Sequence, residues 1–330
     1  MQKVVVGVLR GGPSSEYDIS LLSGQAVLQH LPEDFGRRDI LVTRDGRWHI
    51  DGIETTPDRL HGRVDVIWNA MHGQYGEDGK VQQIFERHYI PYTGSGPLAS
   101  AIAMNKILTK EHYKKEGIKT PRAVVLDVRA QKGETLLYTE GFRPSVGTGT
   151  GYEGISLEIF RKMAPPWVVK PVSSGSSVGI TVVRLLKDLP EAIRIAREHS
   201  EQILVEEYIR GREVTAGVID DFRGHSHYSL FPVEVVRHLD KRVLHAPALT
   251  LSALEKRVVE ELALRVHKSL GLRHYSNTDF IISQRGVYAL ETNSQPGLTR
   301  ESLLPKALHA VGSSYPEFLK HITNLAIMGV

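Results

Sequence analysis

The 330-residue chain contains no cysteine, which excludes a disulfide scaffold, a thiolate nucleophile and a metal site built on thiolates. It also lacks long hydrophobic runs. No segment approaches the roughly 20 apolar residues that cross a bilayer, and residues 1–10 become charged too soon after their apolar stretch to form a signal peptide. The net charge of +3 at pH 7 is too small to favour nucleic acid or a membrane surface. These absences predict a cytoplasmic protein whose partners are small molecules, with no nucleic acid or membrane among them.

The length and the hydrophobic pattern predict an α/β protein of several domains. A chain of this size exceeds the usual single core, so two or three domains are expected. Apolar runs at 4–9, 40–43 and 64–68 alternate with helical patterns at 15–30 and 79–87, which is typical of an open parallel sheet. The ligand crevice of such a sheet lies at the carboxyl ends of its strands.

Later segments predict two further domains. We expect an N-terminal α/β substrate-binding domain at 1–96, a central domain at 97–202 and a C-terminal domain of α+β character at 203–330. The predicted elements are one helix at 98–115, strands at 123–128, 167–172 and 203–209, and a long helix at 253–270.

Two carboxylates and an amide end a predicted hairpin near the C-terminus. In an extended chain Glu291 and Asn293 share a face, and a three-residue loop after Ser283 sets Asp279 opposite Glu291. Facing carboxylates repel, and oxygen ligands without Cys or His suit Mg²⁺. The alternative is a surface salt bridge in which Arg285 or Arg300 neutralises these acids.

Two other segments could bind parts of a nucleotide. Lys170 begins the stretch KPVSSGSSVG (170–179), whose backbone N–H groups and hydroxyls could hold phosphate oxygens, although a hairpin turn with an extended lysine explains it equally well. The residues 206–209 with Glu213 are expected to form an acid-lined strand edge for adenine and ribose, or merely a solvated strand. The Walker phosphate-binding pattern is absent, and GTGTGYEG (147–154) is weak as a dinucleotide loop because no strand clearly feeds it.

Near the N-terminus, GGPSSE (11–16) opens a helix, with Ser14 or Ser15 as its expected cap. Glu16 could bind a ligand or simply favour the first helical turn. The segment HGQYGEDG (72–79) could hold a substrate, although its acids, Glu77 and Asp78, could also cap the next helix.

Together, eight short segments in one order resemble the D-alanine–D-alanine ligase family over almost the full length of the chain. They are GGPSSE (11–16), HGQYGEDG (72–79), PYTGSG (91–96), MNK (104–106), KPVSSGSSVG (170–179), EEYIRGRE (206–213), LETNSQPGLT (290–299) and SLLP (302–305). The resemblance implies a three-domain ATP-grasp architecture, with central and C-terminal ATP-grasp subdomains. It also implies ATP-dependent joining of two D-alanines through an acyl phosphate, for peptidoglycan precursor synthesis. Two Mg²⁺ ions are implied, with Mn²⁺ as a substitute, and the chain could form a homodimer.

The resemblance assigns roles to individual residues. For the metal ions they are Asp279, Glu291 and Asn293. For ATP they are Lys106 and Lys170 on the phosphates, Ser177 in the flap over them, Glu206, Glu207, Tyr208 and Ile209 at the adenine, and Glu213 at the ribose. For the first amino acid they are Glu16, His72 and the catalytic Ser176, and for the second they are Gly297, Ser302 and Leu303.

Two departures from the family bear on activity. The family has an arginine two residues before the metal-binding Asp279, where this chain has Asn277, and losing one oxyanion donor can cost about 3 to 4 kcal/mol of transition-state stabilisation. Lys241 is the predicted replacement cation; Arg242, Arg273 and Arg300 are other candidates. The lid segment 234–248 is short and lacks the family's tyrosine. A changed second substrate, such as D-lactate or D-serine, and an ATP-binding homologue without ligase activity are therefore alternatives.

Overall fold

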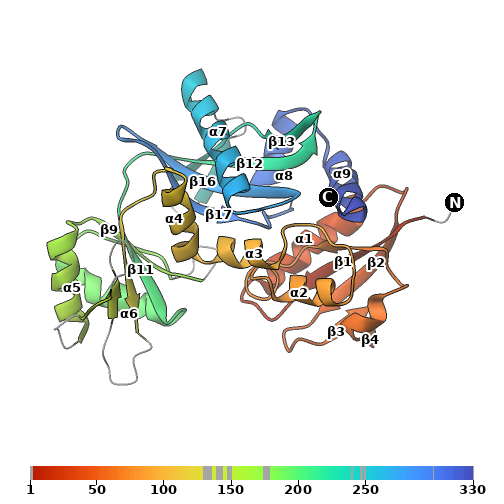
Figure 1. The fold of residues 1–330 in the computed structure, drawn as a ribbon, viewed down its shortest axis with the longest axis horizontal. Helices are drawn as coiled ribbons and strands as arrows, with labels where there is room; N and C mark the ends of the chain where they lie inside the picture. Colours follow the sequence, from red (N-terminus) through yellow and green to blue (C-terminus); the bar gives the residue numbers. More distant parts are fainter. Residues whose placement is uncertain are drawn as a thin grey trace. The chain divides into compact units, whose positions relative to one another are not determined.

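The computed structural model describes residues 3–128, 136–138, 144–146, 151–173, 179–238, 241–245, 248, 250–299 and 301–329, with the backbone alone at 136–138, 144–146, 237–238 and 241–245. It divides into two compact units (Figure 1). The first comprises Met1–Met104, Arg212–Ile282 and Leu290–Val330, and the second comprises Asn105–Gly211 and Ser283–Ala289. The division into domains at 1–96, 97–202 and 203–330 stays a prediction. No helix in the described part of the chain is long and apolar enough to span a membrane.

The N-terminal part of the first unit is the predicted open α/β sheet. Its five strands follow the order β4-β3-β2-β1-β5, with β1 parallel to β2 and β5, and β3 and β4 added antiparallel. The elements are β1 (Val5–Gly11), α1 (Tyr17–His30), β2 (Gly36–Val42), β3 (Trp48–Ile50), β4 (Ile53–Thr55), η1 (Pro57–Leu60), β5 (Val66–Asn69), α2 (Lys80–Arg87) and α3 (Pro97–Met104). The fold class is thus confirmed.

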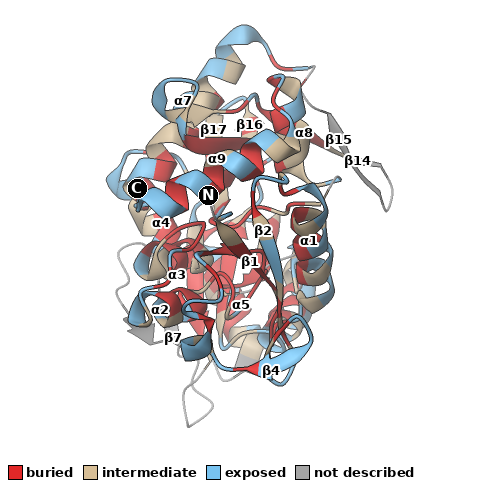
Figure 2. Cartoon of the chain, turned by 90° about the vertical axis from the view of Figure 1, so that its right-hand side faces the viewer, coloured by how far each residue is buried: buried red, intermediate tan, exposed pale blue. Residues whose placement is uncertain are grey.

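Both faces of this sheet are buried, which explains why its strands are continuous apolar runs. Val8 and Trp68 point to one core, which they share with Phe318 of α9 (Tyr315–Met328). Leu9 points to the other face, where it packs with Phe85 of α2. Figure 2 shows the buried strand β1 and the exposed outer side of α9.

Most of a second, antiparallel sheet belongs to the same unit. Its strand order is β15-β14-β12-β16-β17, and β13 pairs with β12. The elements are β12 (Arg212–Phe222), β13 (His225–Ser229), β14 (Val233–His238), β15 (Lys241–His245), α7 (Ala253–Ser269), β16 (Tyr275–Ser283), β17 (Gly286–Asn293) and α8 (Leu303–Ala310). A capping box between Ser252 and Glu255 fixes the start of α7, so the predicted long helix is confirmed.

The second unit is a sheet with helices on both faces. Its order is β10-β9-β11-β6-β7-β8. The elements are α4 (Lys106–Lys115), β6 (Ala123–Asp127), β7 (Leu136–Tyr138), β8 (Pro144–Val146), α5 (Gly151–Lys162), β9 (Trp167–Pro171), β10 (Thr181–Val183), η2 (Leu186–Asp188), α6 (Leu189–Arg197) and β11 (Gln202–Glu207). On one face, Val169 and Val205 pack with α5 and α6, while on the other Leu204 packs with Ile107 of α4. Alternate strand residues therefore serve two cores.

The single helix predicted at 98–115 is wrong, because the chain breaks at Asn105. This residue has an extended backbone, with φ −96° and ψ 103°, and its side chain accepts hydrogen bonds from the N–H groups of Ile107 and Leu108. It therefore caps α4 and separates it from α3. Lys106 becomes the first residue of a new helix.

Candidate active site

The loop after β5 and the start of α1 bring together residues predicted to hold the first substrate. His72 is buried, with Nδ1 3.0 Å from Glu77 Oε1 and Nε2 2.8 Å from Ser23 Oγ. Its backbone N–H donates to Ser20 Oγ (2.8 Å), and its carbonyl accepts from Ser14 Oγ (2.7 Å). Both ring nitrogens and both backbone groups of this histidine are therefore engaged, and the imidazole has one fixed position.

Glu16 lies beside the same loop. Its N–H donates to Ser14 Oγ (3.1 Å), the hydroxyl that also bonds the His72 carbonyl. Its Oε1 lies 3.4 Å from the place that a Cβ would take on Gly73. Glu16 itself is the N-cap residue of α1 and makes no side-chain capping bond, so the cap expected at Ser14 or Ser15 is wrong. The Glu16 carboxylate is not used by the helix.

Glu77 belongs to the segment predicted to hold a substrate, where the alternative for this residue was a helix cap. Burial raises the pKa of its carboxyl group, and the hydrogen bond to His72 offsets only part of that rise. At the start of α2 the carboxylate of Asp78 instead accepts from the N–H of Lys80 (3.2 Å). A possible signal for Glu77 was its position in the same glycine-rich loop, five residues after His72.

Strands β16 and β17 carry the predicted metal ligands. Asp279 lies on β16, and Glu291 and Asn293 lie two residues apart on the neighbouring strand β17. A 3.0 Å hydrogen bond joins Thr278 Oγ1 and Thr292 Oγ1. These threonines face each other in the register that sets Asp279 opposite Glu291 on the other face of the sheet. The hydrogen bond therefore supports the pairing of the two carboxylates.

The donor atoms of this group fit Mg²⁺, because carboxylate and amide oxygens are the ligands that this ion prefers. Neighbouring groups hold two of the ligands. Thr215 Oγ1 donates to Asp279 Oδ1, and Asn293 Oδ1 accepts from the N–H of Gln295 (2.7 Å). Such supporting bonds fix the direction of ligand atoms. Arg285, one of the two alternative partners for these acids, forms an ion pair with Glu207 at 3.4 Å. The other, Arg300, lies outside the described residues.

Glu213, the predicted ribose ligand, lies on the same face of the sheet as Asp279. Strand β12 pairs with β16 so that Glu213 lies opposite Ile281 and Thr215 lies opposite Asp279. Alternate residues of a strand share a face, so Glu213 and Asp279 are diagonal neighbours, typically about 7 to 8 Å apart. One sheet thus carries both predicted functions.

In the second unit, three buried charges form a compact cluster around Glu206. Its Oε1 lies 2.7 Å from Lys110 Nζ, and its Oε2 lies 2.7 Å from Lys170 Nζ. The side chains of Lys110, Lys170 and Glu206 are 5%, 6% and 3% exposed. Lys106, the first residue of α4, which also carries Lys110, is buried as well. Its backbone N–H donates to Val172 O (3.4 Å). The predicted phosphate lysines therefore lie at one end of this sheet.

Lys110 is the member of this cluster that the sequence did not identify. Burial lowers the pKa of Lys110 to about 8, although Glu206 opposes this change. Burial would raise the pKa of Glu206, but Lys110 and Lys170 together keep it below its ordinary value. The signal in the sequence was the four-residue spacing from Lys106, which places both lysines on one helix face.

The predicted strand edge is wrong, because β11 lies inside its sheet between β9 and β6. Glu206 is tolerated there through its lysine partners. On the other face, Glu207 Oε1 accepts from the N–H of Arg122 (3.1 Å). The N–H of Tyr208 donates to a backbone carbonyl of residue 166 (3.0 Å), and Ile209 is buried. The segment predicted to bind adenine therefore lies at the end of an interior strand.

The residues predicted for the second substrate lie close together before α8. A Cβ on Gly297 would lie 2.8 Å from Ser302 Oγ, and Ser302 Oγ also lies 2.8 Å from Thr299 Oγ1. Ser302 is the N-cap residue of α8, without a side-chain capping bond, and Leu303 is its first helical residue. The turn thus presents a glycine and a hydroxyl at one point.

Some predicted residues fall outside the described part of the chain. Ser176 and Ser177 lie in the segment 174–178, of which nothing is described. Lys241 is the first residue of β15 and pairs with His238 in the backbone register, but its side chain is not described. The roles of these three residues stay predictions.

Asn277, in place of the family's arginine, is 7% exposed. It lies opposite Gly217, where an added Cβ would come within 2.7 Å of Asn277 Oδ1. Arg273, one candidate for the missing cation, donates through Nε to Gly94 O (2.9 Å) and lies 4.8 Å from the centre of the Tyr92 ring. This arginine is therefore held by the 91–96 segment.

Comparisons with known proteins agree with this arrangement. Residues 151–324 match the family model of the D-ala D-ala ligase C-terminus, and residues 51–95 match that of the N-terminus. The chain is 34% identical over 330 residues to the D-alanine–D-alanine ligase of Desulforamulus reducens and 35% identical over 337 residues to that of Carboxydothermus hydrogenoformans, with 98% of each chain covered. The solved structure of the VanG D-Ala:D-Ser ligase from Enterococcus faecalis aligns with a TM-score of 0.83 at 26% identity, covering 98% of this chain and all of that one.

Proposed function

The chain belongs to the D-alanine–D-alanine ligase family, and from this membership we propose that it joins two molecules of D-alanine with conversion of ATP to ADP and phosphate. The product, D-alanyl-D-alanine, serves peptidoglycan synthesis. The observation that carries the proposal is Glu16 beside the fixed His72. A protein that only bound nucleotide would have no use for a carboxylate held there to receive an ammonium group.

The reaction requires activation of a carboxylate, which is a poor electrophile. A carboxylate oxygen of the first D-alanine attacks the γ-phosphorus of ATP, the bond to ADP breaks, and an acyl phosphate forms. The amine of the second D-alanine then attacks the carbonyl carbon. Phosphate leaves with the carboxylate oxygen, and the amine releases a proton. In such transfers the protein acts chiefly by positioning and by electrostatic stabilisation.

The first amino acid is held by the N-terminal site. Glu16 binds the ammonium group by charge, and His72 orients the molecule from a position that Glu77 and Ser23 fix. Because burial keeps such hydrogen bonds from exchanging with water, the site is organised before the substrate arrives. Gly297 and Ser302 receive the second amino acid, where the missing Cβ leaves room beside the hydroxyl.

Each unit carries charged groups to which we assign a role at the phosphates. Lys106 and Lys170 contact phosphate oxygens, and Glu206 holds Lys170 and Lys110 in place at 2.7 Å. Asp279, Glu291 and Asn293 would hold two Mg²⁺ ions, or Mn²⁺ in their place. When bound, these ions neutralise charge on the ATP phosphates. Glu206 is therefore assigned a positioning role, in addition to the adenine contact expected from the resemblance.

The proposal also covers location and assembly: the enzyme works in the cytoplasm, and two copies form a homodimer. Ser176 and Ser177 act at the phosphates, and Lys241 acts at the oxyanion. Light scattering on an eluting gel-filtration peak tests the assembly: twice the chain mass supports the dimer, and the single mass of 36.8 kDa contradicts it.

ADP release with defined acids tests the function. We expect release with D-alanine alone and a dipeptide in the product by mass spectrometry. Glu16→Gln should lower the rate and raise the D-alanine KM while leaving ATP binding unchanged. A faster reaction with D-alanine plus D-serine or D-lactate would indicate a changed second substrate. ATP binding without ADP release from any pair would show a degenerate nucleotide-binding protein.

A further inference from the structure

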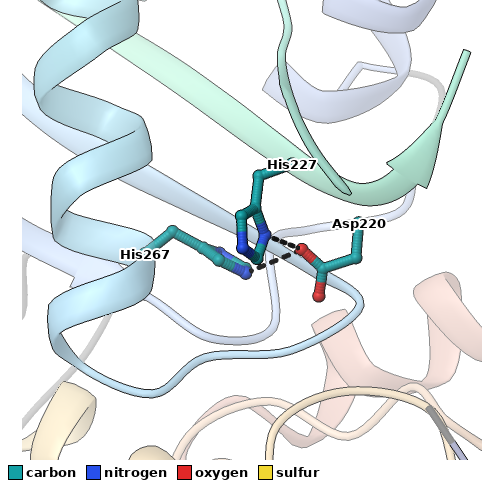
Figure 3. Close-up of side chains that lie close together, drawn as sticks. All are labelled: Asp220, His227 and His267. Carbon is teal, nitrogen blue, oxygen red and sulfur yellow. Dashed lines mark hydrogen bonds and ion pairs between the residues drawn. The ribbon is translucent and has the colours of Figure 1, made fainter. Parts of the chain in front are cut away.

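A second group of metal-ligand side chains lies in the first unit, apart from Asp279, Glu291 and Asn293. Asp220 on β12, His227 on β13 and His267 near the end of α7 each offer a ligand atom, and these atoms lie within 4.8 Å of one another. In Figure 3 both imidazole rings point toward the Asp220 carboxylate. The ligase chemistry described above uses none of these residues.

The distances resemble those between ligands of one ion. Asp220 Oδ1 lies 2.7 Å from His227 Nδ1 and 3.1 Å from His267 Nε2. Ligands at about 2.0 to 2.1 Å around a tetrahedral ion are about 3.3 Å apart. One separation therefore nearly matches, and the other would open by about half an ångström.

His267 Nε2 gives the second argument. It is completely buried and lies 3.1 Å from Asp220 Oδ1, yet it is not aligned for a hydrogen bond to that oxygen. A buried imidazole nitrogen that has an ion-pair contact but no aligned hydrogen bond is less favourable than one that is fully hydrogen-bonded. If the nitrogen instead coordinates an ion together with Oδ1, both atoms face the ion and neither needs to face the other.

Outer contacts hold two of the three ligands, as is common in metal sites. His267 Nδ1 lies 2.7 Å from Ser276 Oγ, a contact that holds the ring with its other nitrogen, Nε2, directed toward Asp220. Asp220 Oδ2 accepts from the N–H of His274 (2.5 Å), which leaves Oδ1 for the ion. Metal-binding imidazoles and carboxylates commonly have such partners.

Access also suits a cation. The His227 side chain is 28% exposed, whereas that of His267 is 0% exposed. The group is therefore open on the His227 side, where an ion can enter and a water can complete its coordination.

We propose that Asp220, His227 and His267 bind one divalent transition-metal ion of the Zn²⁺ class. Two imidazoles and a carboxylate suit Zn²⁺, Co²⁺ or Ni²⁺, whereas Mg²⁺ prefers oxygen ligands alone. The ion joins the end of α7 to the β12–β13 hairpin, so its role is to stabilise this part of the first unit. The chain would thus bind Mg²⁺ through oxygen ligands at Asp279, Glu291 and Asn293, and a Zn²⁺-class ion at the separate group around Asp220.

Calorimetric titration of the chelator-stripped full chain with Zn²⁺ tests the proposal, in excess Mg²⁺ to occupy the oxygen-ligand group. We expect one Zn²⁺ per chain and binding at least about tenfold weaker in His227→Ala. His225→Ala is the matched control, because His225 is an exposed histidine on the same strand, and it should bind as the wild type does. Co²⁺ should give visible absorption bands that are lost in His227→Ala and kept in His225→Ala.

Two further variants make the outcome decisive. His267→Gln should also abolish the Co²⁺ bands. If this variant does not fold, His227→Ala still tests the site, because His227 is partly exposed and its replacement disturbs the fold less. Glu291→Gln should keep full Zn²⁺ binding. The proposal is overturned if the wild type takes up less than one Zn²⁺, if His225→Ala weakens binding as much as His227→Ala does, or if Glu291→Gln removes it.

Discussion

Replacing Glu206 by glutamine should destabilise the second unit strongly in the absence of ATP. Glutamine keeps the shape of the side chain but removes the charge that lies 2.7 Å from both Lys110 Nζ and Lys170 Nζ. All three side chains are at most 6% exposed, so water cannot replace the lost partner. Breaking a buried ion pair in this way costs about 3 to 5 kcal/mol.

Amide hydrogen exchange measures this loss locally, which is needed because two units can unfold separately. At 1.4 kcal/mol for each factor of ten, we expect amides of β9, β11 and α4 to exchange about 100 to 4,000 times faster in Glu206→Gln. Exchange in the sheet of β1, β2 and β5 should stay unchanged.

Glu207→Gln is the matched control for this variant. Glu207 follows Glu206 on the same strand, but its partners Arg122 and Arg285 lie 3.7 and 3.4 Å away and are 61% and 57% exposed. Such pairs contribute about 0 to 1 kcal/mol, so exchange should rise less than about tenfold. Equal effects of the two variants would refute the cluster as the source of stability.

Three further predictions concern charge and substrate binding. Burial lowers the pKa of Lys110 in the folded chain to about 8, against 10.5 for an ordinary lysine, so the unfolded chain binds more protons between these two pH values. Stability to urea should therefore rise with pH from about 8 to 10.5, and Lys110→Met should not show this rise. Glu77→Gln should raise the D-alanine KM about tenfold with an unchanged ATP KM, because an amide replaces the charged partner of His72; equal changes in both constants would contradict this. Asn277→Arg should not raise the ligation rate, because the larger charged side chain meets a buried position opposite Gly217; a tenfold gain in initial rate would instead show that the missing cation limits the reaction.

Local signals in the sequence were enough to predict many helices and strands and the pairing of β16 with β17. Continuous apolar runs indicated β1 and β5, because both faces of that sheet are buried. The start of α7 was readable because Ser252 and Glu255 form a capping box within four residues. The threonine bond between Thr278 and Thr292 agrees with a register predicted from the turn and the alternation of side chains.

Features that depend on distant partners were not readable from the sequence. Glu206 looked like part of a solvated edge, and only Lys110 and Lys170, far away in the chain, explain how a glutamate lies inside a sheet. The break at Asn105 has local partners, but it escaped notice because helical patterns continue on both sides of a single capping residue. Glu77 gained its role from the folding of one loop around His72.

The route of one oxygen atom tests the proposed ligase reaction most directly. D-alanine labelled with oxygen-18 in its carboxylate is incubated with ATP, Mg²⁺ and the protein, and the released phosphate is analysed by mass spectrometry. An acyl phosphate transfers one carboxylate oxygen to phosphate, so each dipeptide formed should yield one singly labelled phosphate. Unlabelled phosphate, or phosphate released without dipeptide, would contradict the proposal that this chain activates D-alanine by phosphorylation.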